Sequence, residues 1–83
     1  MPIPSELKCF VKPGLEGFIE KYSTTPEQMV RMIAEDVIRN SLNSHNSDDA
    51  LKASTMARSI LQAAEKLSYA CRAAVVEVIE SVL

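Results

Sequence analysis

The stretch "SILQAAEKLSYACRAAVV" (Ser59–Val76) decides the fold, because its apolar residues have helical spacing but few of them are large. Five of its eighteen residues are alanine. Small side chains on a buried face let two helices approach toward the close end of the usual distance, about 8–10 Å between their axes. The stretch therefore predicts a helix that packs closely against at least one other helix.

The same spacing covers the last part of the chain. Residues 49–83 contain no glycine or proline, and their apolar positions recur at alternating intervals of four and three, as in a coiled coil. We call these positions the seam: Ala53, Ala57, Ile60, Ala64, Leu67, Cys71, Ala74 and Val78. The unbroken spacing predicts one long helix over 49–83. A break near 66–69 is the alternative, because Ser68 is a good N-cap for a separate last helix.

The segment "STTPEQMV" (Ser23–Val30) contains a helix start signal. Thr25 suits the N-cap and Pro26 suits the first helical position. Gln28 lies three residues after Thr25, as in a capping box. These residues predict a helix over 26–42. A shorter helix is expected over 14–22, after an irregular or extended N-terminal arm over 1–13, and a polar link over 43–48 precedes the long helix.

These elements predict an all-α fold: a helical hairpin with a short N-terminal helix and a long C-terminal helix. The helix over 26–42 is about half as long as the helix over 49–83, so part of the seam should stay exposed. A second copy would cover it most simply and give a dimeric helical bundle. The residues expected at this dimer or partner interface are Ala57, Ile60, Ala64, Leu67, Cys71, Ala74, Val75, Val78, Ile79 and Val82.

Composition limits the classes of partner. A chain of 83 residues has room for one domain, and its net charge of −2 comes from mixed signs with no run of lysine or arginine. Nucleic acid is therefore not the expected partner. No apolar run approaches the ~18 residues of a membrane span, so no membrane partner is expected. The N-terminus lacks the pattern of a signal peptide, which favours a cytoplasmic location.

The chain also lacks the residue patterns of a catalytic or metal site. Its single histidine, His45, stands in the polar link without a cysteine or second histidine at ligand spacing. We find no nucleophile–base pair and no cofactor motif, so we expect no catalytic, cofactor-binding or metal-binding residues. The sequence predicts a small non-enzymatic interaction or regulatory protein that acts through protein–protein contacts as a homodimer.

An alternative comes from a resemblance. The order of an alternating arm ("LKCFVK", Leu7–Lys12), a short helix and a well-capped second helix resembles ribbon-helix-helix DNA-binding proteins over residues 7–42. The resemblance implies a transcriptional regulator in which a dimer's two-stranded ribbon reads DNA, with Lys8, Phe10 and Lys12 facing outward. The chain departs from the family in its short first helix and in having no clustered basic charge to hold phosphates.

Overall fold

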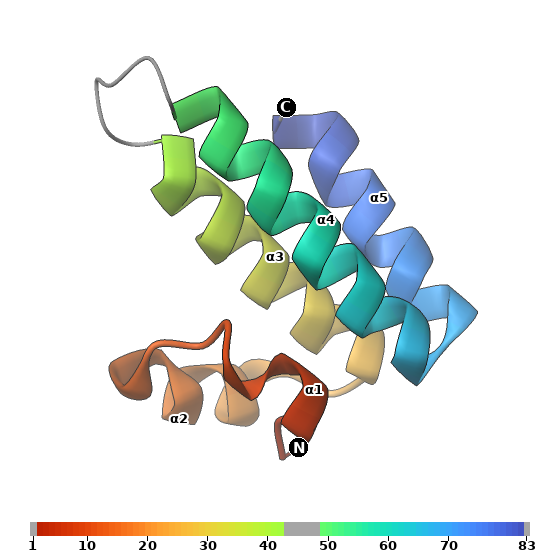
Figure 1. Ribbon diagram of the computed structural model, residues 1–83. Helices are drawn as coiled ribbons and strands as arrows, with labels where there is room; N and C mark the ends of the chain where they lie inside the picture. The colour runs from red at the N-terminus through yellow and green to blue at the C-terminus, as the bar shows by residue number, and fades with distance from the viewer. Residues whose placement is uncertain (1, 43–48, 83) are drawn as a thin grey trace.

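Three helices of the computed structural model, which describes residues 2–42 and 49–82, form a bundle: α3 (Pro26–Leu42), α4 (Asp49–Leu67) and α5 (Tyr69–Val82). The chain runs along α3, returns along α4 and turns again into α5, and each helix packs against the other two (Figure 1). Two shorter helices, α1 (Ser5–Lys8) and α2 (Pro13–Tyr22), precede the bundle. The described residues contain no strand. The predicted all-α class is therefore confirmed, whereas the predicted link over 43–48, with His45, lies outside the described residues.

The start of α3 has the capping geometry that the sequence predicts. The hydroxyl oxygen of Thr25 accepts the backbone N–H of Gln28 at 3.2 Å. The side-chain oxygen of Gln28 in turn accepts the backbone N–H of Thr24 at 2.9 Å, one residue before the partner of a standard capping box. Because these bonds provide acceptors for amide groups at the helix start, α3 begins at Pro26 and keeps the predicted bounds.

The expectation of one unbroken helix over 49–83 is wrong, and the alternative break is the one observed. Helix α4 ends at Leu67, and α5 begins at Tyr69. Ser68 separates them, and its hydroxyl oxygen accepts the backbone N–H of Cys71 at 3.1 Å. This bond caps the first turn of α5, so the chain folds back at Ser68 and does not continue along the axis of α4.

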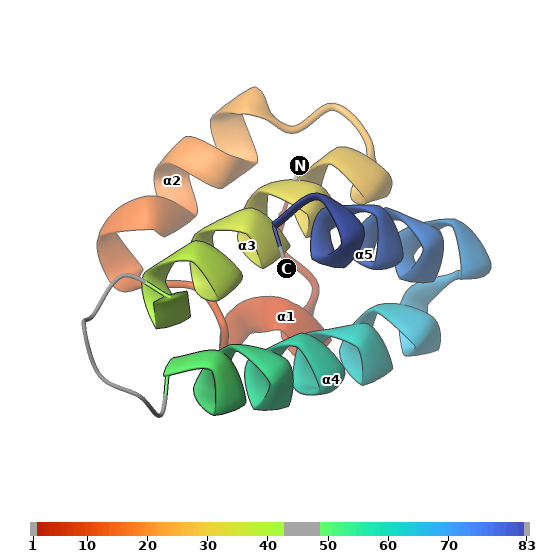
Figure 2. The same ribbon diagram turned by 90° about the horizontal axis from the view of Figure 1, so that it is seen from above.

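The fold-back places the seam inside the molecule. Figure 2 shows α3, α4 and α5 side by side. Aliphatic side chains and several alanines of these helices form the buried core. Seven of the eight seam residues are buried, and Leu67 is half-buried against the core. Of the five alanines in Ser59–Val76, Ala64 and Ala74 thus act as close-packing positions within one chain, whereas Ala70 is exposed. The buried seam residues are Ala53, Ala57, Ile60, Ala64, Cys71, Ala74 and Val78.

Part of the N-terminal arm is helical, where the sequence predicted an irregular or extended segment. Ser5–Lys8 forms the single turn of α1, which contacts α4. The side chains of Ile3 and Leu7 are buried in the same core as α3, α4 and α5. The period-two pattern of Leu7–Lys12 therefore does not correspond to a strand: burial of Leu7 comes from a helical turn that packs against the bundle.

One ion pair joins the first and last helices of the bundle. The Arg31 guanidinium on α3 pairs with the Glu77 carboxylate on α5. Both side chains are substantially exposed, so the pair contributes at most about 1 kcal/mol. Burial of the aliphatic core, and not this contact, accounts for the docking of α5 on α3.

Candidate functional site

The residues predicted to form a dimer interface lie in or against the core of one chain. The ten positions named for that interface divide between buried residues and half-buried ones, and none of them is exposed. The half-buried ones are Leu67, Ile79 and Val82. Because α5 folds back, the exposed stripe that was to bind a second copy does not exist in this structure. The homodimer itself stays a prediction, because the chain's own core covers the residues expected to bind a second copy.

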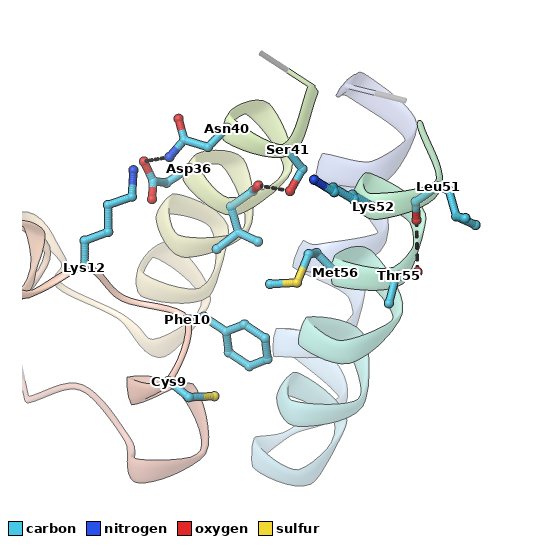
Figure 3. A pocket seen from close by; sticks show the side chains of 11 residues that line it. Cys9, Phe10, Lys12, Asp36, Asn40, Ser41, Leu51, Lys52, Thr55 and Met56 are labelled. Atoms are coloured by element: carbon cyan, nitrogen blue, oxygen red, sulfur yellow. Dashed lines mark hydrogen bonds between the residues drawn. The ribbon is translucent and has the colours of Figure 1, made fainter. Parts of the chain in front are cut away.

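A groove of about 550 Å³ lies at the end of the bundle where α3 ends and α4 begins (Figure 3). Three segments distant in sequence line it: the α1–α2 connection, the second half of α3 and the first turns of α4. We call it the groove and define it by its lining residues, Cys9, Phe10, Lys12, Asp36, Val37, Asn40, Ser41, Leu51, Lys52, Thr55 and Met56. Its volume lies within the range of about 300–1,000 Å³ that is typical of ligand sites.

The interior of the groove is apolar. The ring of Phe10 and the thioether of Met56 point toward each other across it, from the arm and from α4 (Figure 3). Both side chains are half-buried and pack against the core. Val37 adds a buried aliphatic surface from α3. Methionine adapts its shape to what it contacts, so this interior can accommodate large apolar side chains of different shapes.

The polar groups of the rim bond mainly within their own helices. The hydroxyl of Ser41 donates to the backbone carbonyl of Val37 at 2.9 Å, and that of Thr55 donates to the carbonyl of Leu51 at 2.9 Å. The amide nitrogen of Asn40 donates to the carboxylate of Asp36 at 3.1 Å. Both hydroxyls thus donate to carbonyls of their own helices, and neither donates to a general base as an activated nucleophile would.

Two lysines flank the groove. Lys12 extends from the arm toward the side of α3 that carries Asp36 and Asn40, and Lys52 lies on α4 (Figure 3). Both side chains are exposed. Together with the Asp36 carboxylate, the lining residues carry one net positive charge, in a chain whose net charge is −2.

The structure brings together only part of the set predicted for DNA contact. Phe10 and Lys12 line the groove, whereas Lys8 is exposed on α1 outside it. None of these three residues is in a strand. The ribbon that the ribbon-helix-helix resemblance implies is therefore absent from the described residues.

A second feature lies on the outer side of α2. Phe18 and Tyr22, four residues apart, are 52% and 57% exposed, and their ring centroids lie 4.7 Å apart. We call this pair the aromatic ridge. Helix α2 buries only Ile19 fully, and Phe18 also borders a smaller hollow of about 280 Å³ between α2 and α3.

Sequence reasoning missed the groove because no local motif marks it. Its three segments, 9–12, 36–41 and 51–56, become neighbours only after α4 has folded back along α3 and the arm has packed on α4. The available signal was limited to two apolar residues outside the predicted core: Phe10 in the N-terminal arm, and Met56 beside the seam.

Across residues 2–42 and 49–82, no group of three or more histidine, cysteine, aspartate or glutamate side chains is arranged to hold a metal ion. In the same part of the chain, each helix is too short or too polar to cross a membrane. Comparison with protein-family profiles, with curated proteins and with solved structures found no match to this chain.

Proposed function

We propose that this chain is a non-enzymatic interaction protein that binds another polypeptide through the groove. The observation that carries the proposal is a hollow of about 550 Å³ with an apolar interior and a polar, positively charged rim. Protein interfaces combine these two features: a desolvated apolar centre that supplies affinity and a polar edge that supplies orientation.

The hydrogen bonds of the rim support binding rather than catalysis. Ser41 and Thr55 already donate their hydroxyl protons to helix carbonyls. An arriving partner can therefore bury this rim without leaving these donors unpaired, and unpaired donors are the main cost of burying polar groups. The exposed thiol of Cys9 also lines the groove.

A comparison of partners captured by matched variants tests this proposal. Purified protein would be immobilised as the wild type, as Met56→Glu in the groove, and as Tyr69→Ser, which changes an 81% exposed aromatic residue outside it. We expect Met56→Glu to lose the bound polypeptides and Tyr69→Ser to keep them. Equal capture by all three forms would contradict a binding role for the groove.

Retention on a heparin column, with and without added salt, tests the DNA-associated alternative on the same proteins. Binding to phosphate backbones weakens steeply as salt rises, because it depends on release of counterions. The groove proposal predicts no retention at physiological salt, since the two rim lysines are too few to hold a polyanion. Strong, salt-sensitive retention that Lys8→Ala or Lys12→Ala abolishes would favour the alternative.

A further inference from the structure

We propose that the occupant of the groove is a short acidic segment of another polypeptide. Large apolar side chains of the segment enter the interior, and flanking carboxylates lie against Lys12 and Lys52. This inference rests on the proposed function, because it names the chemistry of the partner for the same site. The size of the groove, its charges and the hydrogen-bond acceptors of its rim each support it.

The apolar part of the groove is small. It consists of the half-buried Phe10 and Met56, the buried Val37 and the exposed Leu51, and every other lining residue except Cys9 is polar. A volume of about 550 Å³ has room for the large apolar side chains of one segment. A folded partner with a standard interface of ~800 Å² per side would also have to cover the charged rim. The groove therefore favours a short segment over a broad protein face.

The two lysines lie on either side of this apolar part. Lys12 lies on the α3 side of Phe10 and Met56, and Lys52 lies on the α4 side (Figure 3). Asp36 offsets part of the charge of Lys12, whereas Lys52 forms no ion pair with any carboxylate whose side chain the structure describes. A segment with acidic flanks therefore meets opposite charge at the edges of the groove, and one with basic flanks meets like charge.

The rim can also bind the backbone of such a segment. The hydroxyls of Ser41 and Thr55 donate their protons to helix carbonyls, so each oxygen keeps lone pairs that can accept a hydrogen bond. A short segment without secondary structure of its own has backbone N–H groups that need acceptors once it is bound. These two oxygens, one from α3 and one from α4, provide acceptors at the groove.

Three matched tetrapeptides with blocked ends test the inference: Asp-Leu-Phe-Asp, Asn-Leu-Phe-Asn and Lys-Leu-Phe-Lys. They share one apolar pair and differ only in the charge of their flanks. Titration into the wild type, followed by the NMR shifts of backbone amides, gives the three dissociation constants. We expect the acidic peptide to bind about fivefold more tightly than the neutral one, because two exposed ion pairs are added, and the basic peptide to bind most weakly. Added salt should reduce the difference.

Lys52→Glu is the decisive variant, because it reverses the charge of an exposed rim position without disturbing the core. It should weaken the acidic peptide and strengthen the basic one. Tyr69→Ser, which changes an exposed aromatic residue outside the groove, is the matched control and should leave all three constants unchanged. The exposed thiol of Cys9 provides a second measurement within the groove, since the acidic peptide should slow its alkylation.

Three results would overturn the inference. One is that none of the peptides shifts the amides of the groove, and another is that all three bind equally well. The third is a wild type that dimerises while Met56→Glu stays monomeric, which would make a second copy the occupant. If any of these is found while Met56→Glu still loses the captured polypeptides, the proposed function stands without the acidic segment. If Met56→Glu retains the captured polypeptides as well, both proposals fail.

Discussion

The hydroxyl oxygen of Ser68 lies 3.1 Å from the amide nitrogen of Cys71, and this bond begins the fifth helix. Without it, the amide groups in the first turn of α5 would have no side-chain acceptor. With it, a seam that has the spacing of one long helix divides into two shorter helices that pack on each other. The cap thus stabilises the start of α5, and core packing holds the apolar residues of α5 against their own chain.

We expect Ser68→Ala to lower the free energy of unfolding by about 1 kcal/mol, the usual loss when a serine N-cap is removed. Ser68→Asp should retain most of the stability, because aspartate is an equally good cap. Ser59→Ala, at an exposed position inside α4, is the matched control and should change little. Urea denaturation followed by circular dichroism measures all three. Equal midpoints for Ser68→Ala and Ser59→Ala would show that the cap does not stabilise the turn.

Val78→Glu should unfold the chain and not merely dissociate a dimer. The side chain of Val78 lies in the core and is only 2% exposed. The substitution would therefore bury a carboxyl group, either ionised or protonated, among apolar side chains. The expected loss is about 3 kcal/mol or more, a large part of the stability of a small domain. Ser81→Glu, at an exposed position one turn later, is the control. A Val78→Glu variant that stays folded and sediments as a monomer would support the exposed interface predicted from the sequence.

Thr25→Ala should cost about 1 kcal/mol, because it removes the acceptor for the backbone N–H of Gln28. Thr55→Ala is the matched control, because the Thr55 hydroxyl donates only to the Leu51 carbonyl within the same helix. It should lower the stability of the protein much less than Thr25→Ala does. Thermal melts at a single protein concentration compare the two variants. A Thr25→Ala variant that melts at the same temperature as the wild type would mean that α3 does not depend on its cap.

The two free cysteines should differ strongly in reactivity. Cys9 is exposed and lines the groove, whereas Cys71 is buried in the first turn of α5. An aromatic disulfide reagent should label one thiol per native chain quickly and the second only as the fold opens. Added urea should speed the second phase and leave the first unchanged. Rapid labelling of both thiols in the native protein would show that α5 does not pack as described.

The sequence predicts the parts of this fold that depend on local signals. Thr25, Pro26 and Gln28 define the start of α3 because a cap is made by neighbours in the chain. The break at Ser68 is harder to predict, because Leu67 and Cys71 keep the interval of four in either arrangement. A long helix facing a partner and two helices facing each other need the same apolar positions. Only tertiary packing distinguishes them.

The groove could not be predicted for a related reason. Phe10, Val37 and Met56 come from three segments that are distant in the chain. The order of these segments in the sequence does not predict that they lie next to one another in the fold. The helical turn of α1 is likewise set by the burial of Leu7 against the bundle, although the alternation around it is typical of a strand. At both places, contacts between distant segments override the local pattern.

The distance between the two ends of the seam tests the fold-back at Ser68 most directly. Spin labels at Ser54 and Ser81, both exposed, would be introduced by cysteine substitution in a chain that also carries Cys9→Ser and Cys71→Ala. Dilution with unlabelled protein restricts the electron–electron coupling to labels in one chain. The fold-back predicts a short distance, roughly the 8–10 Å between packed helix axes plus the reach of the labels. A continuous helix would place the two positions about 40 Å apart, and a distance near that value would contradict the account.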